Sequence, residues 1–131
     1  MIVAVTGGTG FLGGHVLRLA AEAGHQVRAL TRRAQLPQPG VEWLRGTLED
    51  HVALGELVDG VDAVIHVAGV VNAPTLAGFV EGNVTGTASL VTATEAAGVR
   101  RFVHVSSRAS RTCPIMAGRS APPRRWWSNP R

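Results

Sequence analysis

The hydrophobic pattern of the first hundred residues switches between two periods. Short apolar runs rich in β-branched residues are typical of buried parallel strands, and they lie at 2–6, 25–33, 41–46, 61–69 and 101–106. Apolar residues at helical spacing fill the segments between these runs, at about 11–23, 51–60 and 74–97. Strands that alternate with helices predict an α/β fold, a doubly wound parallel sheet of about five strands covered on both faces.

Glycines mark the end of one predicted helix and interrupt another. Gly24 follows the first helical segment, at the position where a helix C-terminus favours glycine. Gly78, Gly82 and Gly86 lie inside the segment 74–97, whose apolar residues otherwise fit one long helix. Because glycine has a low helix propensity, these three residues weaken the helical pattern there.

The pattern of strands and helices ends at Ser107. From Arg108 onward neither period survives, and four prolines interrupt any helix. Residues 1–107 hold seven arginines and all nine acidic residues, whereas 108–131 hold six arginines and no acid, so the formal net charge of +4 comes from the tail. We therefore predict a domain over 1–107, truncated after its fifth strand, and an irregular basic tail over 108–131 that is disordered or frameshifted.

Length and composition exclude several classes of protein. A chain of 131 residues is one ordinary domain, because domains commonly have about 100–150 residues. No apolar run reaches the roughly 20 residues of a membrane-spanning helix, and no basic leader precedes the first apolar run. The single cysteine, Cys113, cannot form an internal disulfide or a cysteine-rich metal site. We expect a cytoplasmic protein without a membrane partner and without a metal.

The segment "VTGGTGFLGG" lies between the first predicted strand and the first predicted helix. It holds Gly7, Gly10 and Gly13 at the spacing G-x-x-G-x-x-G. The first glycine permits a tight turn, the second lets the backbone approach a pyrophosphate, and the third lets the helix pack closely on the strand. A phosphate would bind at the helix N-terminus. The alternative is a glycine-rich turn that only connects two elements.

Five segments resemble, in order, the motifs of one family. They are "TGGTGFLG", "GTLED", "VIHVAG", "NVTGT" and "RRFVHVSS". Together they resemble the extended short-chain dehydrogenase/reductase family, also called the NAD-dependent epimerase/dehydratase family, almost continuously over residues 1–107. The resemblance implies an NAD(P)-binding Rossmann fold.

The resemblance also implies which residues contact the dinucleotide. Around the pyrophosphate these are Gly7, Thr9, Gly10, Phe11, Leu12 and Gly13; near the adenine Leu48; and on the ribose side Ala68 and Gly69. The chain departs from the family at Thr47, where the family has an aspartate, so that adenine contact is not expected.

The residues after the second predicted strand favour NADP over NAD. NAD-binding proteins carry an acidic residue there for the ribose 2′-hydroxyl, whereas arginine accommodates a 2′-phosphate. This chain has Arg32 and Arg33 and no carboxylate at that place. The alternative is that both arginines are solvated charges that open a loop.

The reaction that the resemblance implies is hydride transfer to or from nicotinamide, with a Tyr as acid/base, a Lys four residues later, and a Ser that hydrogen-bonds the substrate oxygen. Ser107 matches the Ser, with a turn or capping serine as the alternative. The chain contains no Tyr and no Lys. Asn83 matches a family position with a structural or water-organising role. We interpret the five histidines as isolated surface or satisfied core residues: His15, His25, His51, His66 and His104.

One hypothesis for the missing Tyr and Lys is a shifted reading frame, which the genetic code permits. If the frame slips after Ser107, the boundary of Ile115 and Met116 can encode Tyr, and the boundary of Arg119 and Ser120 can encode Lys. That restores the family's spacing. The hypothesis fails if no single-base slip in the gene restores both residues, or if related genes share this tail.

We therefore predict an NAD(P)-binding domain of the epimerase/dehydratase or NADP-dependent carbonyl/alcohol oxidoreductase type, inactive without the Tyr and Lys. Its partners are the dinucleotide and a small-molecule substrate of unknown identity. Two alternatives remain: a non-catalytic NADP-binding redox-sensing module, and a nucleic-acid-binding arm formed by the arginines of the tail with Trp126 and Trp127, which basic composition alone supports weakly.

Overall fold

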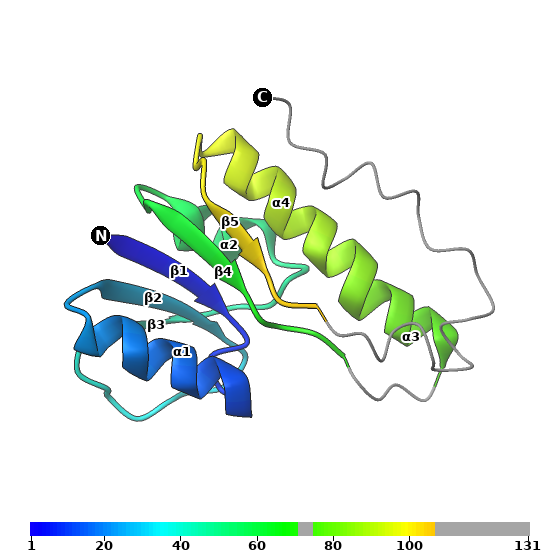
Figure 1. The fold of residues 1–131 in the computed structure, drawn as a ribbon. Helices are drawn as coiled ribbons and strands as arrows, with labels where there is room; N and C mark the ends of the chain where they lie inside the picture. Colours follow the sequence, from blue (N-terminus) through cyan, green and yellow to red (C-terminus); the bar gives the residue numbers. More distant parts are fainter. Residues whose placement is uncertain (71–74, 107–131) are drawn as a thin grey trace.

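A computed structural model describes residues 1–70 and 75–106 of the chain (Figure 1). In chain order the elements are β1 (Ile2–Thr6), α1 (Phe11–Glu22), β2 (Gln26–Thr31), β3 (Val41–Arg45), α2 (His51–Val58), β4 (Ala63–His66), α3 (Leu76–Val80), the π-helical turn η1 (Glu81–Thr85), α4 (Gly86–Ala96) and β5 (Phe102–His104). The predictions for Ser107 and for the tail 108–131 lie outside the described residues, as does Pro74, the predicted start of the long helix.

The five strands form one parallel sheet in the order β3-β2-β1-β4-β5. From β1 the chain runs outward through β2 to β3, and then returns to the other side of β1 for β4 and β5 (Figure 1). The strand order therefore reverses between β1 and β4. In open α/β sheets, ligands bind in the crevice beyond the carboxyl ends of the strands at such a reversal.

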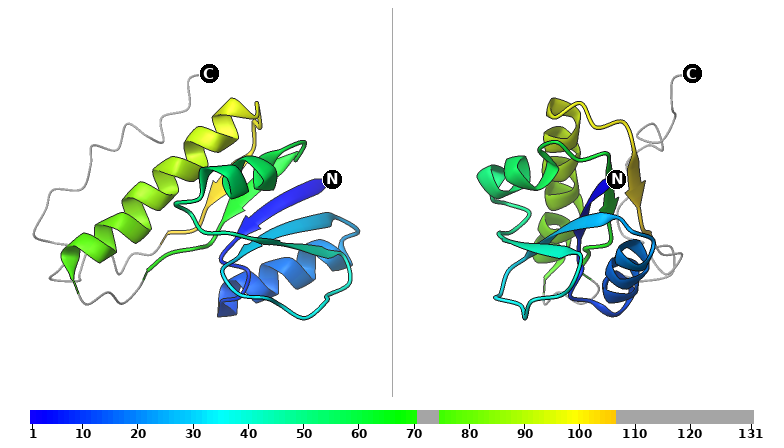
Figure 2. Two further views of the ribbon diagram at one scale, coloured as in Figure 1. Left: turned by 180° about the vertical axis from the view of Figure 1, so that it is seen from behind. Right: turned by 90° about the vertical axis from the view of Figure 1, so that its left-hand side faces the viewer.

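Helices cover both faces of the sheet, as the sequence pattern predicts (Figure 2). On one face, Leu17 of α1 packs against Val5 and other apolar residues of β1 and β2. On the other face, Leu54 of α2 and Leu90 of α4 pack against Ala4 and its neighbours. Side chains alternate between faces along a strand, so β1 supplies both clusters and is buried on each side. The doubly wound α/β fold is confirmed.

Most strands are shorter than their apolar runs. The second run, 25–33, gives a strand over Gln26–Thr31, and the fourth, 61–69, gives one over Ala63–His66. Residues that flank β4 are also bonded to β1. The Asp62 carboxylate accepts a hydrogen bond from the Ile2 amide at 2.7 Å, and the Asp62 amide donates to the Ile2 carbonyl at 2.9 Å. The Val67 amide donates to the Thr6 carbonyl at 3.1 Å. The flanking apolar residues belong to loops that are packed but not paired over their full length.

The predicted long helix exists, with a π-helical turn in its middle. Helical backbone runs through α3, η1 and α4. A Cβ atom on Gly82 would overlap the Val70 side chain, and one on Gly86 would lie 2.9 Å from Leu48 Cδ1. These glycines are therefore the places where loops from the carboxyl edge of the sheet press against the helix. They do not break it.

Candidate functional site

Gly7 joins the end of β1 to the turn that precedes α1. Its φ is +76°, in the left-handed region that favours glycine. A Cβ at this position would lie 2.5 Å from the Ala68 amide nitrogen and 2.7 Å from the Ala68 Cα, both of them backbone atoms beyond β4. Any side chain here would therefore push apart the two loops that follow β1 and β4.

Gly13 lets the first turn of α1 lie directly on this loop. A Cβ on Gly13 would fall far inside van der Waals contact with the Gly7 carbonyl oxygen, and 2.8 Å from the Gly8 Cα. Because backbone occupies that space, no side-chain rearrangement would make room. Gly13 thus sets the distance between the helix and the glycine turn, the packing role expected from its spacing.

Gly10 is the open member of the motif. It is the N-cap of α1, its amide donates to the Gly7 carbonyl at 3.1 Å, and an added Cβ would meet only the Gly7 oxygen, at 3.4 Å. No side chain caps this helix end, and its first turn holds no acidic residue. Phe11 and Leu12 are 89% and 47% exposed. The amides at this N-terminus can therefore bind an anion that approaches close to the backbone.

The loop of Ala68, Gly69 and Val70, here called the 68–70 loop, follows β4 and lies against Gly7. Asn83 of η1 holds it at Val70. The Asn83 Oδ1 accepts from the Val70 amide at 2.9 Å, and its Nδ2 donates to the carbonyls of Val70 at 2.8 Å and Phe79 at 3.0 Å. Of the two roles that the sequence leaves open for Asn83, these bonds confirm the structural one.

His66, at the end of β4, lies fully buried beneath both loops. The Thr6 hydroxyl lies 2.5 Å from its Nδ1, and the Thr87 hydroxyl lies 2.9 Å from its Nε2. The Thr87 hydroxyl donates its single proton to the Asn83 carbonyl at 2.7 Å. It must then accept from His66, so the imidazole carries its proton on Nε2 and accepts the Thr6 proton at Nδ1.

Burial and a second histidine keep His66 neutral. Burial, and after it the neighbouring His104, lower the pKa of His66 to about 4. The two rings lie 5.1 Å apart between centroids, and burial also lowers the pKa of His104. The prediction of a satisfied core residue is confirmed for His66, but the prediction that it is isolated is wrong. The sequence places both histidines near the ends of predicted strands, but only the register of β4 and β5 in the structure pairs His66 with His104.

The segment around Leu48, the residue expected near the adenine, takes a structural position at the carboxyl edge of the sheet. The Asp50 carboxylate caps α2, accepting from the amides of Val52 at 3.1 Å and Ala53 at 3.0 Å. Leu48 is partly buried and packs against Gly86 of α4. Thr47, the departure from the family motif, is also partly buried.

Arg32 and Arg33 follow directly on the carboxyl end of β2, the strand beside β1. Thr31 fixes the backbone there: its hydroxyl donates to the Arg33 carbonyl at 2.7 Å and accepts from the Arg33 amide at 3.3 Å. Both arginines are exposed, and no ion pair within residues 1–70 and 75–106 involves either of them. Two guanidinium groups are thus available to an anion at this edge.

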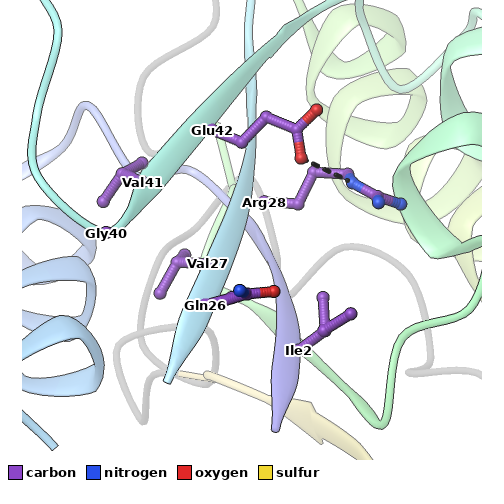
Figure 3. Close-up of a pocket in the computed structure, with 7 residues that line it drawn as sticks. All are labelled: Ile2, Gln26, Val27, Arg28, Gly40, Val41 and Glu42. Atoms are coloured by element: carbon purple, nitrogen blue, oxygen red, sulfur yellow. Dashed lines mark hydrogen bonds and ion pairs between the residues drawn. The ribbon is translucent and has the colours of Figure 1, made fainter. Parts of the chain in front are cut away.

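A pocket of about 360 Å³ lies at the opposite edge, at the amino ends of β1, β2 and β3 (Figure 3). Arg28 crosses it toward Glu42 at 3.2 Å and donates to the carbonyls of Glu56 and Asp59 at the end of α2. The pocket is lined by Ile2, Gln26, Val27, Arg28, Gly40, Val41 and Glu42. None of them belongs to the site expected from the sequence.

The structure brings most of the expected residues to one edge of the sheet. Gly7 lies directly against the 68–70 loop, and Gly10 and Gly13 lie against Gly7. Arg32, Arg33 and Leu48 lie on the neighbouring loops of that edge. Sequence reasoning missed His66 with its two threonines. Within the described part of the chain, no helix has the length and apolarity needed to cross a membrane.

Comparisons with known proteins agree with this geometry. The sequence profile of the NAD dependent epimerase/dehydratase family matches residues 3–119. A ceramide reductase of Caulobacter vibrioides is 42% identical over 114 residues, which cover 84% of this chain and 36% of that protein. A 3 beta-hydroxysteroid dehydrogenase/Delta 5-->4-isomerase of Mycobacterium tuberculosis is 35% identical over 115 residues, covering 80% of this chain and 31% of that protein.

Among solved structures, a short-chain dehydrogenase/reductase superfamily protein from Agrobacterium tumefaciens with bound NAD is similar, with a TM-score of 0.73 and 37% identity. The match covers 82% of this chain and 33% of that one. The chain spans about a third of the length of the curated relatives it matches.

Proposed function

The chain belongs to the NAD dependent epimerase/dehydratase family, and from that premise we propose that its described part binds a nicotinamide dinucleotide across the crevice between β1 and β4. The observation that supports the proposal is that the three glycines of the turn have different surroundings. Backbone atoms fill the space beside Gly7 and Gly13, whereas the space beside Gly10 is open at an uncapped helix N-terminus. This is the shape that a pyrophosphate requires.

In this proposal, residues of three loops contact different parts of the dinucleotide. The amides of Gly10, Phe11 and Leu12 hold the pyrophosphate, with Thr9 beside them. Ala68 and Gly69 contact the ribose side, and Leu48 lies toward the adenine. A bound dinucleotide supplies hydride transfer, and the described residues bind and orient it.

We also propose that the chain prefers NADP to NAD. Arg32 and Arg33 are exposed, unpaired among the described residues, and held on a backbone that Thr31 fixes. Guanidinium groups bind phosphate through parallel hydrogen bonds. The ribose 2′-phosphate distinguishes NADP from NAD, and it would lie at the end of β2 beside these groups.

Carbonyl/alcohol oxidoreduction is the reaction class that we propose for the protein to which this domain belongs. The support is the names of its relatives, a reductase and a dehydrogenase. The family's proton transfer uses a Tyr and a Lys, and this sequence contains neither. We therefore expect this chain to bind the dinucleotide without turnover, with Ser107 as a substrate-binding residue. The alternative of a redox-sensing module finds no support among the relatives named above.

Calorimetric titration of residues 1–131 with NADP and NAD tests the proposal. The Gly10→Ala variant is expected to lose affinity by about tenfold or more, because its methyl group occupies the approach of the pyrophosphate. Its melting temperature should fall only slightly, since the added Cβ meets one atom at 3.4 Å. In the matched control Gly14→Ala the Cβ lies 3.8 Å from the nearest atom, so both affinity and fold should persist. Equal affinity of Gly10→Ala and wild type would refute the proposed phosphate position.

A further inference from the structure

We propose that His66 is a positioning residue, which holds the 68–70 loop in the conformation that receives the dinucleotide; this inference rests on the proposed function. His66 contacts no ligand in this scheme. It acts through two threonines and an asparagine that come from three different elements.

The first half of the connection joins His66 to the start of the loop. The Ala68 amide points to the Thr6 hydroxyl at 3.4 Å, and that hydroxyl donates to His66 Nδ1. Thr6 is the last residue of β1 and directly precedes the glycine turn, with 1% of its surface exposed. The loop after β4 and the turn after β1 are therefore tied to the same imidazole nitrogen.

The second half joins His66 to the end of the loop. The His66 Nε2 donates to Thr87 of α4, Thr87 donates to the Asn83 carbonyl, and the Asn83 side chain pairs with both the amide and the carbonyl of Val70. The connection that leaves the loop at Ala68 thus returns to it at Val70. Together with the covalent bonds within Asn83 and along the backbone from Ala68 to Val70, these hydrogen bonds form a closed circuit around Gly69.

The chemistry of the circuit permits one arrangement of protons. Each threonine hydroxyl has a single proton, so both donate in the same sense around the circuit, and the imidazole must be neutral with its proton on Nε2. His66 and Thr6 are buried, where a donor or acceptor left unsatisfied is costly. The circuit therefore favours one loop conformation strongly over the alternatives.

A loop held in this way benefits binding. Gly69 is exposed between the two tethered amides, and an added Cβ would meet only Asn83 Oδ1, at 3.2 Å. Its backbone is thereby presented to the crevice in a fixed geometry. A ligand that meets a preformed loop does not lose affinity to the ordering of that loop.

Thr87→Val opens the circuit in the full chain, and Thr94→Val is its matched control. Both replacements remove a hydroxyl from α4, but the Thr94 hydroxyl donates only within the helix, to the Leu90 carbonyl at 2.7 Å. Thr87→Val should weaken NADP binding by about threefold to tenfold and speed hydrogen exchange at the Ala68 and Val70 amides in the unliganded chain. Thr94→Val should change neither. Identical effects of the two variants would overturn the proposal.

The hydrogen-exchange measurement separates this inference from the proposed function. If wild type binds neither NADP nor NAD, the proposed function fails, and the exchange rates of the two amides still decide whether the circuit exists. A further check is the ¹⁵N spectrum of the His66 ring, which should show a neutral imidazole protonated at Nε2. A His66→Gln variant, which retains a donor toward Thr87, should bind more tightly than His66→Phe; equal binding of the two would also count against the circuit.

Discussion

Three glycines within seven residues of each other serve three physical purposes at the crevice. Gly7 needs a positive φ and lies against the Ala68 backbone, whereas Gly13 brings helix α1 onto the Gly7 carbonyl. Gly10 has neither constraint and leaves its face open. Substitutions at Gly7 and Gly13 should therefore impair folding, whereas a substitution at Gly10 should impair ligand binding. Variants of this one motif can thus distinguish stability from affinity.

We expect the proposed preference for NADP to depend on two side chains, Arg32 and Arg33. A double variant, Arg32→Gln with Arg33→Gln, should lower NADP affinity about tenfold to hundredfold and leave NAD affinity almost unchanged, because only NADP carries the 2′-phosphate. Fluorescence titration with both dinucleotides measures this. Arg100→Gln removes an exposed arginine before β5, at the opposite edge, and is the control for net charge. A parallel loss of both affinities in the double variant would contradict the assignment.

Acid should destabilise the fold through His66. Its pKa lies at about 4 in the folded chain, against 6.5 for an ordinary histidine. The unfolded chain therefore binds the proton more tightly, and the contribution of neutral His66 to stability is complete above pH 6.5 and is lost as the pH falls toward 4. The loss amounts to as much as about 3 kcal/mol.

Urea unfolding between pH 7.5 and 4.5 measures this dependence. His66→Gln should be less stable than wild type at neutral pH, with a flatter dependence on pH, because Gln does not titrate. A variant whose stability falls with acid as steeply as that of wild type would show that other groups control the acid sensitivity.

At the scale of elements, the helix from Leu76 to Ala96 is shaped by what it contacts. Val70 packs at Gly82 and Leu48 at Gly86, and the π-helical turn between α3 and α4 carries Asn83 toward the 68–70 loop. π-Helical turns within α-helices are frequent at functional sites. The residues that contact the loops of Leu48 and Val70 are therefore also the ones that depart from a regular α-helix: the glycines have low helix propensity, and Asn83 lies in the π-helical turn.

Replacing helical glycines by alanine should therefore have opposite effects in two helices. Gly55→Ala in α2 places a Cβ where nothing lies within 4 Å, and should stabilise the fold by about 0.5–1 kcal/mol. Gly86→Ala gains the same propensity but brings its Cβ to 2.9 Å and 3.0 Å from Leu48 atoms, and should destabilise the fold. Thermal and urea unfolding measure both changes. Equal stabilisation by the two variants would show that Leu48 gives way without cost.

Much of the fold could be predicted from local sequence patterns, but the hydrogen bonds around His66 could not. The five strands follow from apolar runs, and the glycine turn from its spacing between a strand and a helix. Gly82 and Gly86 lowered the expectation of a helix because the pattern does not show which loop packs on them. His66 lies 60 residues from Thr6 in the sequence. The two residues become hydrogen-bond partners only because β1 and β4 are neighbours in the sheet.

At the scale of the whole described domain, residues 1–70 and 75–106 leave one face of the sheet partly uncovered. On the face that α1 covers, β1 and β2 lie under the helix, whereas Val103 of β5, which pairs with Ile65, is 53% exposed and Val105 is 37% exposed. No strand among the described residues pairs with the outer edge of β5. An apolar strip beside an unpaired strand edge promotes association between chains.

A charge on this strip should reduce self-association of residues 1–131. Val103→Lys is expected to keep the chain monodisperse to higher concentrations in size-exclusion chromatography with light scattering, because lysine at a sheet edge opposes pairing. Val52→Lys is the control, since Val52 is 74% exposed on α2, on the other side of the sheet. If both variants have the same effect, net charge rather than the strip controls solubility.

The hydrogen bonds around His66 also impose an order on synthesis. The glycine turn and the start of α1 are complete by Gly14, but the bonds that shape the opposite wall require Asn83 and Thr87. A growing chain therefore carries the glycine turn, the proposed phosphate site, before it carries the residues that hold the opposite loop. On the proposed function, we expect dinucleotide present during translation to meet a complete site only after Thr87 has left the ribosome, and so to bind the folded domain without assisting its earliest folding steps.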